Sequence, residues 1–141
     1  DCYGKAWMVV IEVADKGEKV QVRVLEMDRR ERPRVGERVW LPVYDFFEPK
    51  NGQRLVGGTV DEVSIKMSSI VLDENIELMG HSGSPLISQS TGKVIGTLSR
   101  GGTIDGKAYI LIAPSAGILR GMRDAETMRV MPRLGEETRG K

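Results

Sequence analysis

The chain has 141 residues, enough for one domain with its own core, and its 21 Lys and Arg nearly balance its 20 Asp and Glu, leaving a formal net charge of +1. This balance gives no electrostatic reason to expect nucleic acid or a membrane as partner, and no stretch approaches the roughly 20 apolar residues of a membrane span. Abundant glycine and few aromatic residues are typical of a turn-rich β protein. Cys2 is the sole cysteine, so we expect a free thiol and no internal disulfide. A start at Asp1 without Met indicates processing or excision, and the sequence assigns no compartment.

The first part of the chain alternates between apolar and polar residues. Apolar side chains recur at every second position from Trp7 to Val13 and again from Val20 to Val24, with a turn at 15–18 between them. This period of two predicts a β-hairpin over 6–27. The run 28–34 that follows mixes both signs of charge, which favours a solvated connection over a binding patch.

From Val35 onward the pattern predicts about six further short strands. We expect a bulge or bend at Gly57-Gly58, because glycine pairs inside a strand often mark one. Pro114-Ser115 precedes apolar residues at helical spacing, so a helix should begin near Ser115. The expected strands are 35–43, 55–60, 63–67, 70–72, Ile87 with 94–98, and 108–113, and the expected turns are 48–52 and 103–107.

The stretch Gly80-His81-Ser82-Gly83-Ser84-Pro85 places a serine between glycines just ahead of an apolar run. Such a turn can lift a hydroxyl out of the backbone and leave neighbouring N–H groups pointing at one spot. Acyl-transfer chemistry needs this arrangement, with Ser82 as nucleophile and the N–H groups of Gly80 and Ser82 as donors to the oxyanion. Taken alone the composition favours a plain loop, so the interpretation depends on its context.

In that context the chain resembles the trypsin/chymotrypsin-like serine peptidases, in which a Gly-Asp-Ser-Gly-Gly-Pro-type turn precedes a hairpin. Residues 80–85 match this turn, with His81 in the acidic position and Ser84 in a glycine position. Ser99-Arg100-Gly101 matches the Ser-Trp-Gly-type segment that follows, ahead of the final strand and helix. Similar Gly-X-Ser-Gly-Ser-Pro turns also occur in the sporulation-type serine peptidases.

The resemblance extends from about Val35 to Met122 and implies an all-β fold. The second antiparallel β-barrel would be complete and the first barrel partial, with a C-terminal helix. We therefore expect a partial first-barrel hairpin and linker at 1–34, the second barrel with its serine turn and helix at 35–134, and a polar tail at 135–141. An unclosed first sheet exposes an edge, so a missing N-terminal segment or another chain would complete it, unless the first lobe is reduced.

The catalytic partners that the family places in its first barrel are not evident. The one histidine is His81, and adjacent residues on a tight turn point apart, so we expect its ring to pack or hydrogen-bond beneath the turn. By resemblance, Gln21 stands where the acid would fall and Asp1 where the histidine would fall. A lysine base is the other chemical option, with Lys66 and Lys93 candidates by residue type only.

The substrate pocket follows from the resemblance alone. Ile76 would lie at its base, and Ser99, Arg100 and Gly101 would form one wall that pairs with an extended peptide. An apolar base disfavours Lys or Arg side chains, although Ile76 is equally explained as filling one end of the barrel.

The expected function is a serine endopeptidase domain acting on a polypeptide, without a metal or cofactor. A catalytically inactive relative that binds peptides or partner proteins is the alternative, favoured by the missing histidine and acid. A small β-barrel interaction module with a coincidental serine turn is a third interpretation.

Overall fold

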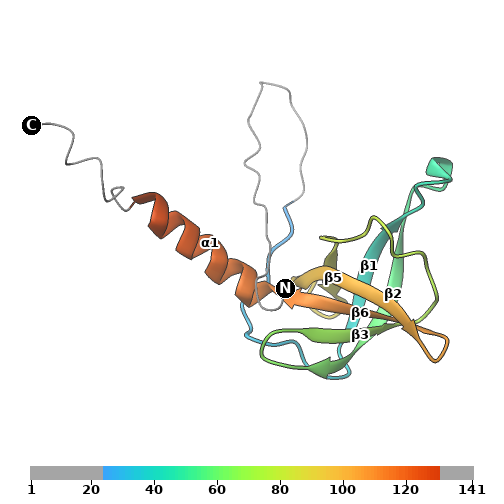
Figure 1. Ribbon diagram of the computed structural model, residues 1–141, viewed down its shortest axis with the longest axis horizontal. Helices are drawn as coiled ribbons and strands as arrows, with labels where there is room; N and C mark the ends of the chain where they lie inside the picture. The colour runs from blue at the N-terminus through green and yellow to red at the C-terminus, as the bar shows by residue number, and fades with distance from the viewer. Residues whose placement is uncertain (1–23, 131–141) are drawn as a thin grey trace, which may run out of the picture.

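The computed structural model describes residues 24–130, with side chains as far as Asp124. Its strands form one closed antiparallel barrel in the order β1-β2-β3-β6-β5-β4, and α1 leaves the end of β6 and projects away from the barrel (Figure 1). The prediction of an all-β barrel followed by a helix from Ser115 is thus confirmed. The elements are β1 (Arg38–Tyr44), the 3-10 helix η1 (Pro49–Asn51), β2 (Gln53–Val63), β3 (Ser68–Leu72), β4 (Pro85–Ser88), β5 (Val94–Ile104), β6 (Lys107–Pro114) and α1 (Ser115–Val130).

The barrel interior is filled by every second residue of the strands. In β1 the inward-facing Val39, Leu41 and Val43 are at most 6% exposed, while Arg38 and Trp40 face outward. The other strands contribute buried Val, Ile and Leu side chains to the same core. The alternation seen in the sequence therefore decides which face of each strand is buried.

β2 corrects the prediction of a bulge at Gly57-Gly58. Both glycines pair in unbroken register with β1, and the shift between β2 and β3 lies at Val60/Glu62 instead. A Cβ on Gly57 would collide with the side chains of Arg38 and Asp73, and a Cβ on Gly58 would crowd β3. The close approach of these side chains and of β3, and not a bend, therefore explains why both positions are glycine.

Two connections also differ from the prediction. Residues 64–67, expected to be strand, form a turn in which both the N–H and the hydroxyl of Ser64 donate to the Met67 carbonyl. The turn expected over 103–107 is confined to Asp105-Gly106, which joins β5 to β6 with φ of 50° and 76°. An Asp-Gly pair with two positive φ values is a favoured two-residue hairpin connection, and it lets both strands run longer.

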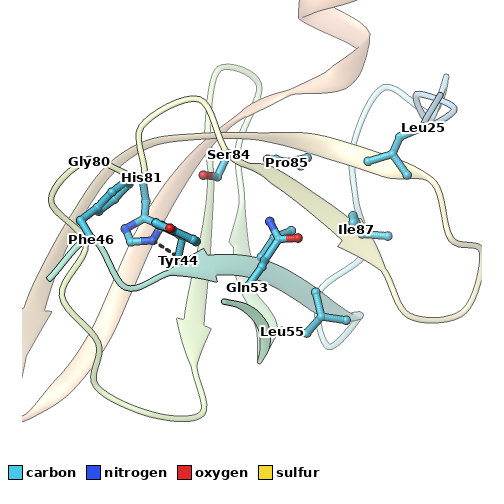
Figure 2. A pocket seen from close by; sticks show the side chains of 11 residues that line it. Leu25, Tyr44, Phe46, Gln53, Leu55, Gly80, His81, Ser84, Pro85 and Ile87 are labelled. Carbon is cyan, nitrogen blue, oxygen red and sulfur yellow. Dashed lines mark hydrogen bonds between the residues drawn. The ribbon is translucent and has the colours of Figure 1, made fainter. Parts of the chain in front are cut away.

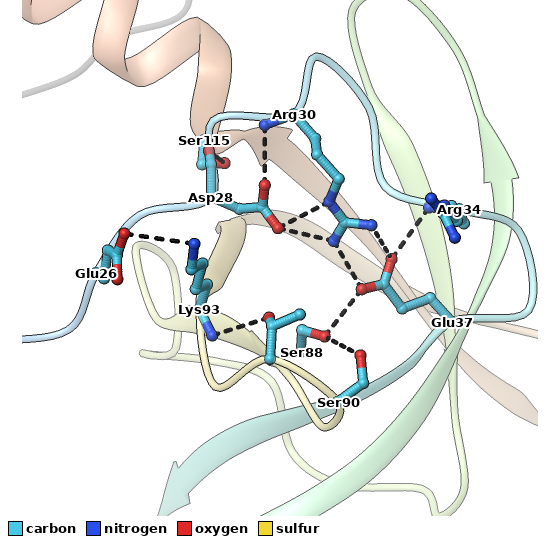
Figure 3. Close-up of polar contacts among 10 residues, drawn as sticks. Glu26, Asp28, Arg30, Arg34, Glu37, Ser88, Ser90, Lys93 and Ser115 are labelled. Carbon is cyan, nitrogen blue, oxygen red and sulfur yellow. Dashed lines mark hydrogen bonds and ion pairs between the residues drawn. The ribbon is translucent and has the colours of Figure 1, made fainter.

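Most residues of the charged run 28–34 are exposed, as expected for a solvated connection, but Asp28 and Arg30 also tie this segment to the barrel. Asp28 is only 6% exposed, and its carboxylate accepts from Arg30 Nε at 2.8 Å. Arg30 also donates to Glu37, which accepts from the Ser88 hydroxyl of β4 at 2.9 Å (Figure 3). The Ser115 hydroxyl at the start of α1 donates to the Asp28 carbonyl at 2.6 Å.

The remaining domain predictions stay untested. The barrel and α1 fall within the range 35–134, and Met27 forms an isolated bridge with Val94. Most of the expected hairpin at 6–27, together with Asp1, Cys2 and Gln21, lies outside the described residues, as does the tail at 135–141.

Candidate functional site

The serine turn, residues 80–85, lies between the barrel core and the surface at the start of β4. The Gly83 N–H donates to the Leu98 carbonyl at 2.7 Å, and the Leu98 N–H donates to the Ser84 carbonyl at 2.8 Å. Inside the turn, the Ser84 N–H donates to the His81 carbonyl at 3.0 Å. These bonds to β5 hold the turn in place and leave Ser82 at its exposed tip.

Gly80 and Gly83 give the turn its shape. Their φ values are 85° and 87°, a left-handed conformation that glycine adopts without strain. Neither the Gly80 N–H nor the Ser82 N–H donates a hydrogen bond to any described residue, and within the described part of the chain the Ser82 hydroxyl has no partner either. Among the described residues, both candidate oxyanion donors are therefore without a hydrogen-bond partner.

The His81 ring turns inward, as expected, and lies beneath the turn. The residue is 6% exposed, and its Nε2 accepts a hydrogen bond from the Tyr44 backbone N–H at 3.1 Å (Figure 2). Because Nε2 is an acceptor, the neutral ring carries its proton on Nδ1. This Nδ1 is buried and has no partner among the described residues.

Phe46, from the loop between β1 and β2, packs against both the imidazole and the turn. The Phe46 and His81 ring centroids are 5.5 Å apart, and Tyr44 meets Phe46 edge-on at 5.3 Å. A Cβ added to Gly80 would lie 2.9 Å from the Phe46 ring. The loop therefore holds the backbone of Gly80 from one side while Tyr44 holds His81.

Tyr44 and Phe46 were not predicted from the sequence as parts of this site. The available indication was the run Tyr44-Asp45-Phe46-Phe47, which contains both phenylalanines of a chain with few aromatic residues. The expected strand ended at residue 43 and the next expected turn began at residue 48, so this run received no assignment. Its contact with residues 80–81 arises only when the barrel closes.

Two open cavities meet at Gly80 and His81. One, of about 390 Å³, extends along β1, β2 and β4 toward Leu25 (Figure 2). The other, of about 1060 Å³, is an aromatic groove between the β1–β2 loop and residues 75–79. Phe46, Phe47 and Met79 contribute exposed apolar side chains to it.

Of the predicted substrate-binding residues, Ile76 lines one of these two cavities and the other three line neither. Ile76 lines the aromatic groove and also packs against the barrel core. Ser99, Arg100 and Gly101 lie exposed on β5 and line neither of the two cavities. Leu78 packs against Gly101 so closely that a Cβ there would collide with it. The pocket implied by the resemblance thus remains a prediction, and in this structure Leu78 occupies the space beside its expected wall.

The candidate bases stand apart from the serine. Lys93 pairs with Glu26 at 3.4 Å. Lys66 lies exposed in the turn that follows β2. The other end of β2 is Gln53, which pairs with Tyr44, so Lys66 and Tyr44 lie at opposite ends of this strand. Neither lysine contacts Ser82 among the described residues, so the identity of a base stays open.

Within residues 24–130, no group of three or more His, Cys, Asp or Glu side chains could hold a metal ion. No helix in this part of the chain is both long and apolar enough to cross a membrane.

Comparisons with known proteins give a distant structural similarity and no match by sequence. No family model matches the sequence, and no curated protein matches it. Among solved structures, a similar chain is the catalytically active tobacco etch virus protease complexed with product, with a TM-score of 0.49 and 18% sequence identity. The alignment covers 72% of this chain and 42% of that protease, so this chain spans less than half of its length. A likeness this distant assigns neither an activity nor residues.

Proposed function

We propose that this chain is a serine endopeptidase domain in which Ser82 attacks the peptide bond. One observation carries the proposal: an exposed serine stands on a turn braced by β5, next to two backbone N–H groups that bond to no described residue. Free N–H groups beside a hydroxyl are what an oxyanion site requires. Tyr44 contacts His81 and Phe46 contacts Gly80, and both contacts fix the turn, which a plain loop does not require.

The chemistry proposed for this site is acyl transfer. The Ser82 Oγ attacks the carbonyl carbon of a polypeptide substrate while a base takes the hydroxyl proton, and the Gly80 and Ser82 N–H groups bind the oxyanion. Collapse of the intermediate breaks the C–N bond, and the amine leaves with the proton from the base. Water then attacks the acyl carbon while the base takes a proton from it, and collapse of the second intermediate breaks the C–O bond to Ser82, whose Oγ regains the proton from the base. Neither a metal nor a cofactor takes part.

No base for the Ser82 hydroxyl is found among the described residues. His81 is its one histidine, and the ring nitrogen that could accept a proton already accepts from Tyr44. We propose that the base lies on a segment outside the described residues. A longer parent protein or another chain would supply this segment, which would face the serine turn. The aromatic groove beside Gly80 would favour an apolar substrate side chain, because Phe46, Phe47 and Ile76 line it.

A second candidate function is peptide or partner binding without turnover. The observation that favours it is the same occupied imidazole, together with the absence of any described lysine contact to Ser82. The cavities and the free N–H groups would then serve recognition alone.

A fluorophosphonate probe tests the proposal, because labelling requires an activated serine hydroxyl. We expect little or no labelling of the isolated chain, since without its partners a catalytic serine retains on the order of one millionth of its turnover. Labelling should appear in a longer parent protein that carries an upstream histidine, and Ser82→Ala should abolish it. Ser84→Ala is the matched control, since only its backbone holds the turn, and it should label like the parent.

Strong labelling of Ser82 in the isolated chain would show that a base is present within it, against our placement. If neither the isolated chain nor the longer protein is labelled, the endopeptidase proposal fails and the binding function takes its place.

A further inference from the structure

Apolar side chains lie exposed along the aromatic groove between the β1–β2 loop and residues 75–79. On the loop, Phe46 is 56% exposed and Phe47 88%, and on the facing segment Met79 is 80% exposed. Aromatic and methionine side chains are enriched where protein surfaces bind a partner, and an exposed apolar patch rimmed by polar residues is typical of an interaction site. The other groups that line the groove indicate the kind of partner.

Each side of the groove also carries one carboxylate that is fixed by its own backbone. On the loop, Asp45 Oδ1 accepts the N–H groups of Phe47 and Glu48, both at 3.0 Å. On the facing segment, Glu77 Oε1 accepts the Met79 N–H at 3.1 Å. The second oxygen of each carboxylate has no hydrogen-bond partner among the described residues. Both charges are therefore held beside the exposed apolar side chains.

No described basic residue neutralises these two carboxylates. Arg54 is the only Lys or Arg among the described residues that line the groove, and its guanidinium pairs with Glu74. Within residues 24–124, neither Asp45 nor Glu77 forms an ion pair. The groove thus presents two uncompensated negative charges next to apolar surface, and charge complementarity favours an occupant that carries positive charge.

A backbone donor also lies at the groove, where the groove meets the serine turn. Gly80 and His81 line it there, and Figure 2 shows both beside Phe46. The Gly80 N–H has no hydrogen-bond partner among the described residues. A polypeptide combines backbone carbonyls, which accept from such an N–H, with apolar and cationic side chains. The volume of about 1060 Å³ slightly exceeds the roughly 300–1,000 Å³ of small-molecule pockets, which suits several residues of an extended segment.

We propose that the aromatic groove binds a polypeptide segment in which an apolar or aromatic residue is flanked by Lys or Arg. The apolar side chain would lie against Phe46, Phe47 and Ile76, and the flanking cations would pair with Asp45 and Glu77 at the sides of the groove. This names the substrate class of the proposed endopeptidase and rests on that function for the segment's role as substrate. Binding itself needs no turnover, so the two proposals can fail separately.

Fluorescence anisotropy tests the binding on the full chain with Ser82→Ala, which prevents cleavage of the probe. The probes are fluorescein-labelled Gly/Ser peptides with a central Lys-Phe-Lys, Glu-Phe-Glu or Lys-Ala-Lys. We expect saturable binding of the Lys-Phe-Lys peptide and about tenfold weaker binding of each of the other two. The affinity for Lys-Phe-Lys should also fall as salt is added, because charge pairs at an open groove are screened.

Two variants separate the apolar contribution from the charge. Asp45→Asn combined with Glu77→Gln removes both charges and keeps an oxygen to accept the backbone N–H groups. It should abolish the preference for Lys over Glu flanks and preserve the preference for Phe over Ala. Phe47→Ser should have the opposite effect. Ile65→Ser and Glu62→Gln are the matched controls, since both side chains are exposed at the other end of β2 and do not line the groove, and they should change neither preference.

Several outcomes would overturn the proposal. These are no saturable binding of the Lys-Phe-Lys peptide, equal affinities for Lys-flanked and Glu-flanked peptides, or equal effects of the groove variants and their controls. A dimer in sedimentation experiments that dissociates in Phe47→Ser would assign the groove to a second copy and would also overturn it. Selective peptide binding without fluorophosphonate labelling of the longer parent protein would support the groove as a peptide site and refute only the endopeptidase function.

Discussion

At the scale of single residues, His81 links the serine turn to β1 through one unusual hydrogen bond. A backbone N–H of a strand end, that of Tyr44, donates to an imidazole nitrogen and not to a carbonyl. The imidazole is buried and packs against Phe46, and the hydrogen bond itself is partly buried. The bond therefore decides both the tautomer of His81 and the position of the turn that carries Ser82.

Substitutions of His81 should separate this acceptor role from simple packing. His81→Gln can place its amide oxygen near the position of Nε2, whereas His81→Leu leaves the Tyr44 N–H without this acceptor. We expect Leu to lower the free energy of unfolding by about 1 kcal/mol relative to Gln, the usual net contribution of one hydrogen bond. Urea unfolding measures the difference, and equal stabilities would show that the bond contributes nothing.

At the scale of elements, the segment before β1 depends on Arg30. This one guanidinium bonds to Asp28 on its own segment and to Glu37 at the entrance of β1, and Glu37 is held in turn by Ser88 of β4 (Figure 3). The carboxylates are far less exposed than an ordinary surface pair, with side-chain exposures of 8% and 9%. Loss of Arg30 would therefore leave two nearly buried charges without their main partner.

Arg30→Met should consequently destabilise the barrel well beyond the effect of an ordinary surface ion pair. We expect a loss of about 2–4 kcal/mol in the free energy of unfolding, because removing one member of a buried pair leaves uncompensated charge. Arg54→Met is the control, since the Arg54–Glu74 pair is about half exposed and should cost less than about 1 kcal/mol. Chemical denaturation compares them, and a loss no larger for Arg30→Met than for Arg54→Met would contradict this account.

At the scale of the whole molecule, local patterns predicted the strands and the resemblance implied the barrel, but neither predicted the contacts between distant segments. Alternation predicted a strand over 35–43, where most of β1 lies, and the Pro114-Ser115 pair marked the start of α1, because both depend on near neighbours. The contact of Phe46 with His81 joins two loops that meet only after closure. The mixed charges of 28–34 look the same in the sequence whether their side chains face water or, like Arg30, bond to Glu37. Leu78 at the expected wall of the substrate pocket is likewise a result of packing.

The stability of the whole fold should fall in acid because of the same cluster. Burial alone would raise the pKa of Asp28 and of Glu37, but hydrogen bonds from Arg30 outweigh it, so both pKa values lie below their ordinary range. The unfolded chain therefore takes up these protons first as the pH falls. The stabilisation is complete at neutral pH and is lost as the pH drops below about 4 and through the lower pKa values of the folded state. Urea unfolding between neutral pH and about pH 3 measures this, with Arg30→Met for comparison. The difference in stability between the two proteins should shrink as the pH falls, and parallel curves would show that the cluster does not cause the acid sensitivity.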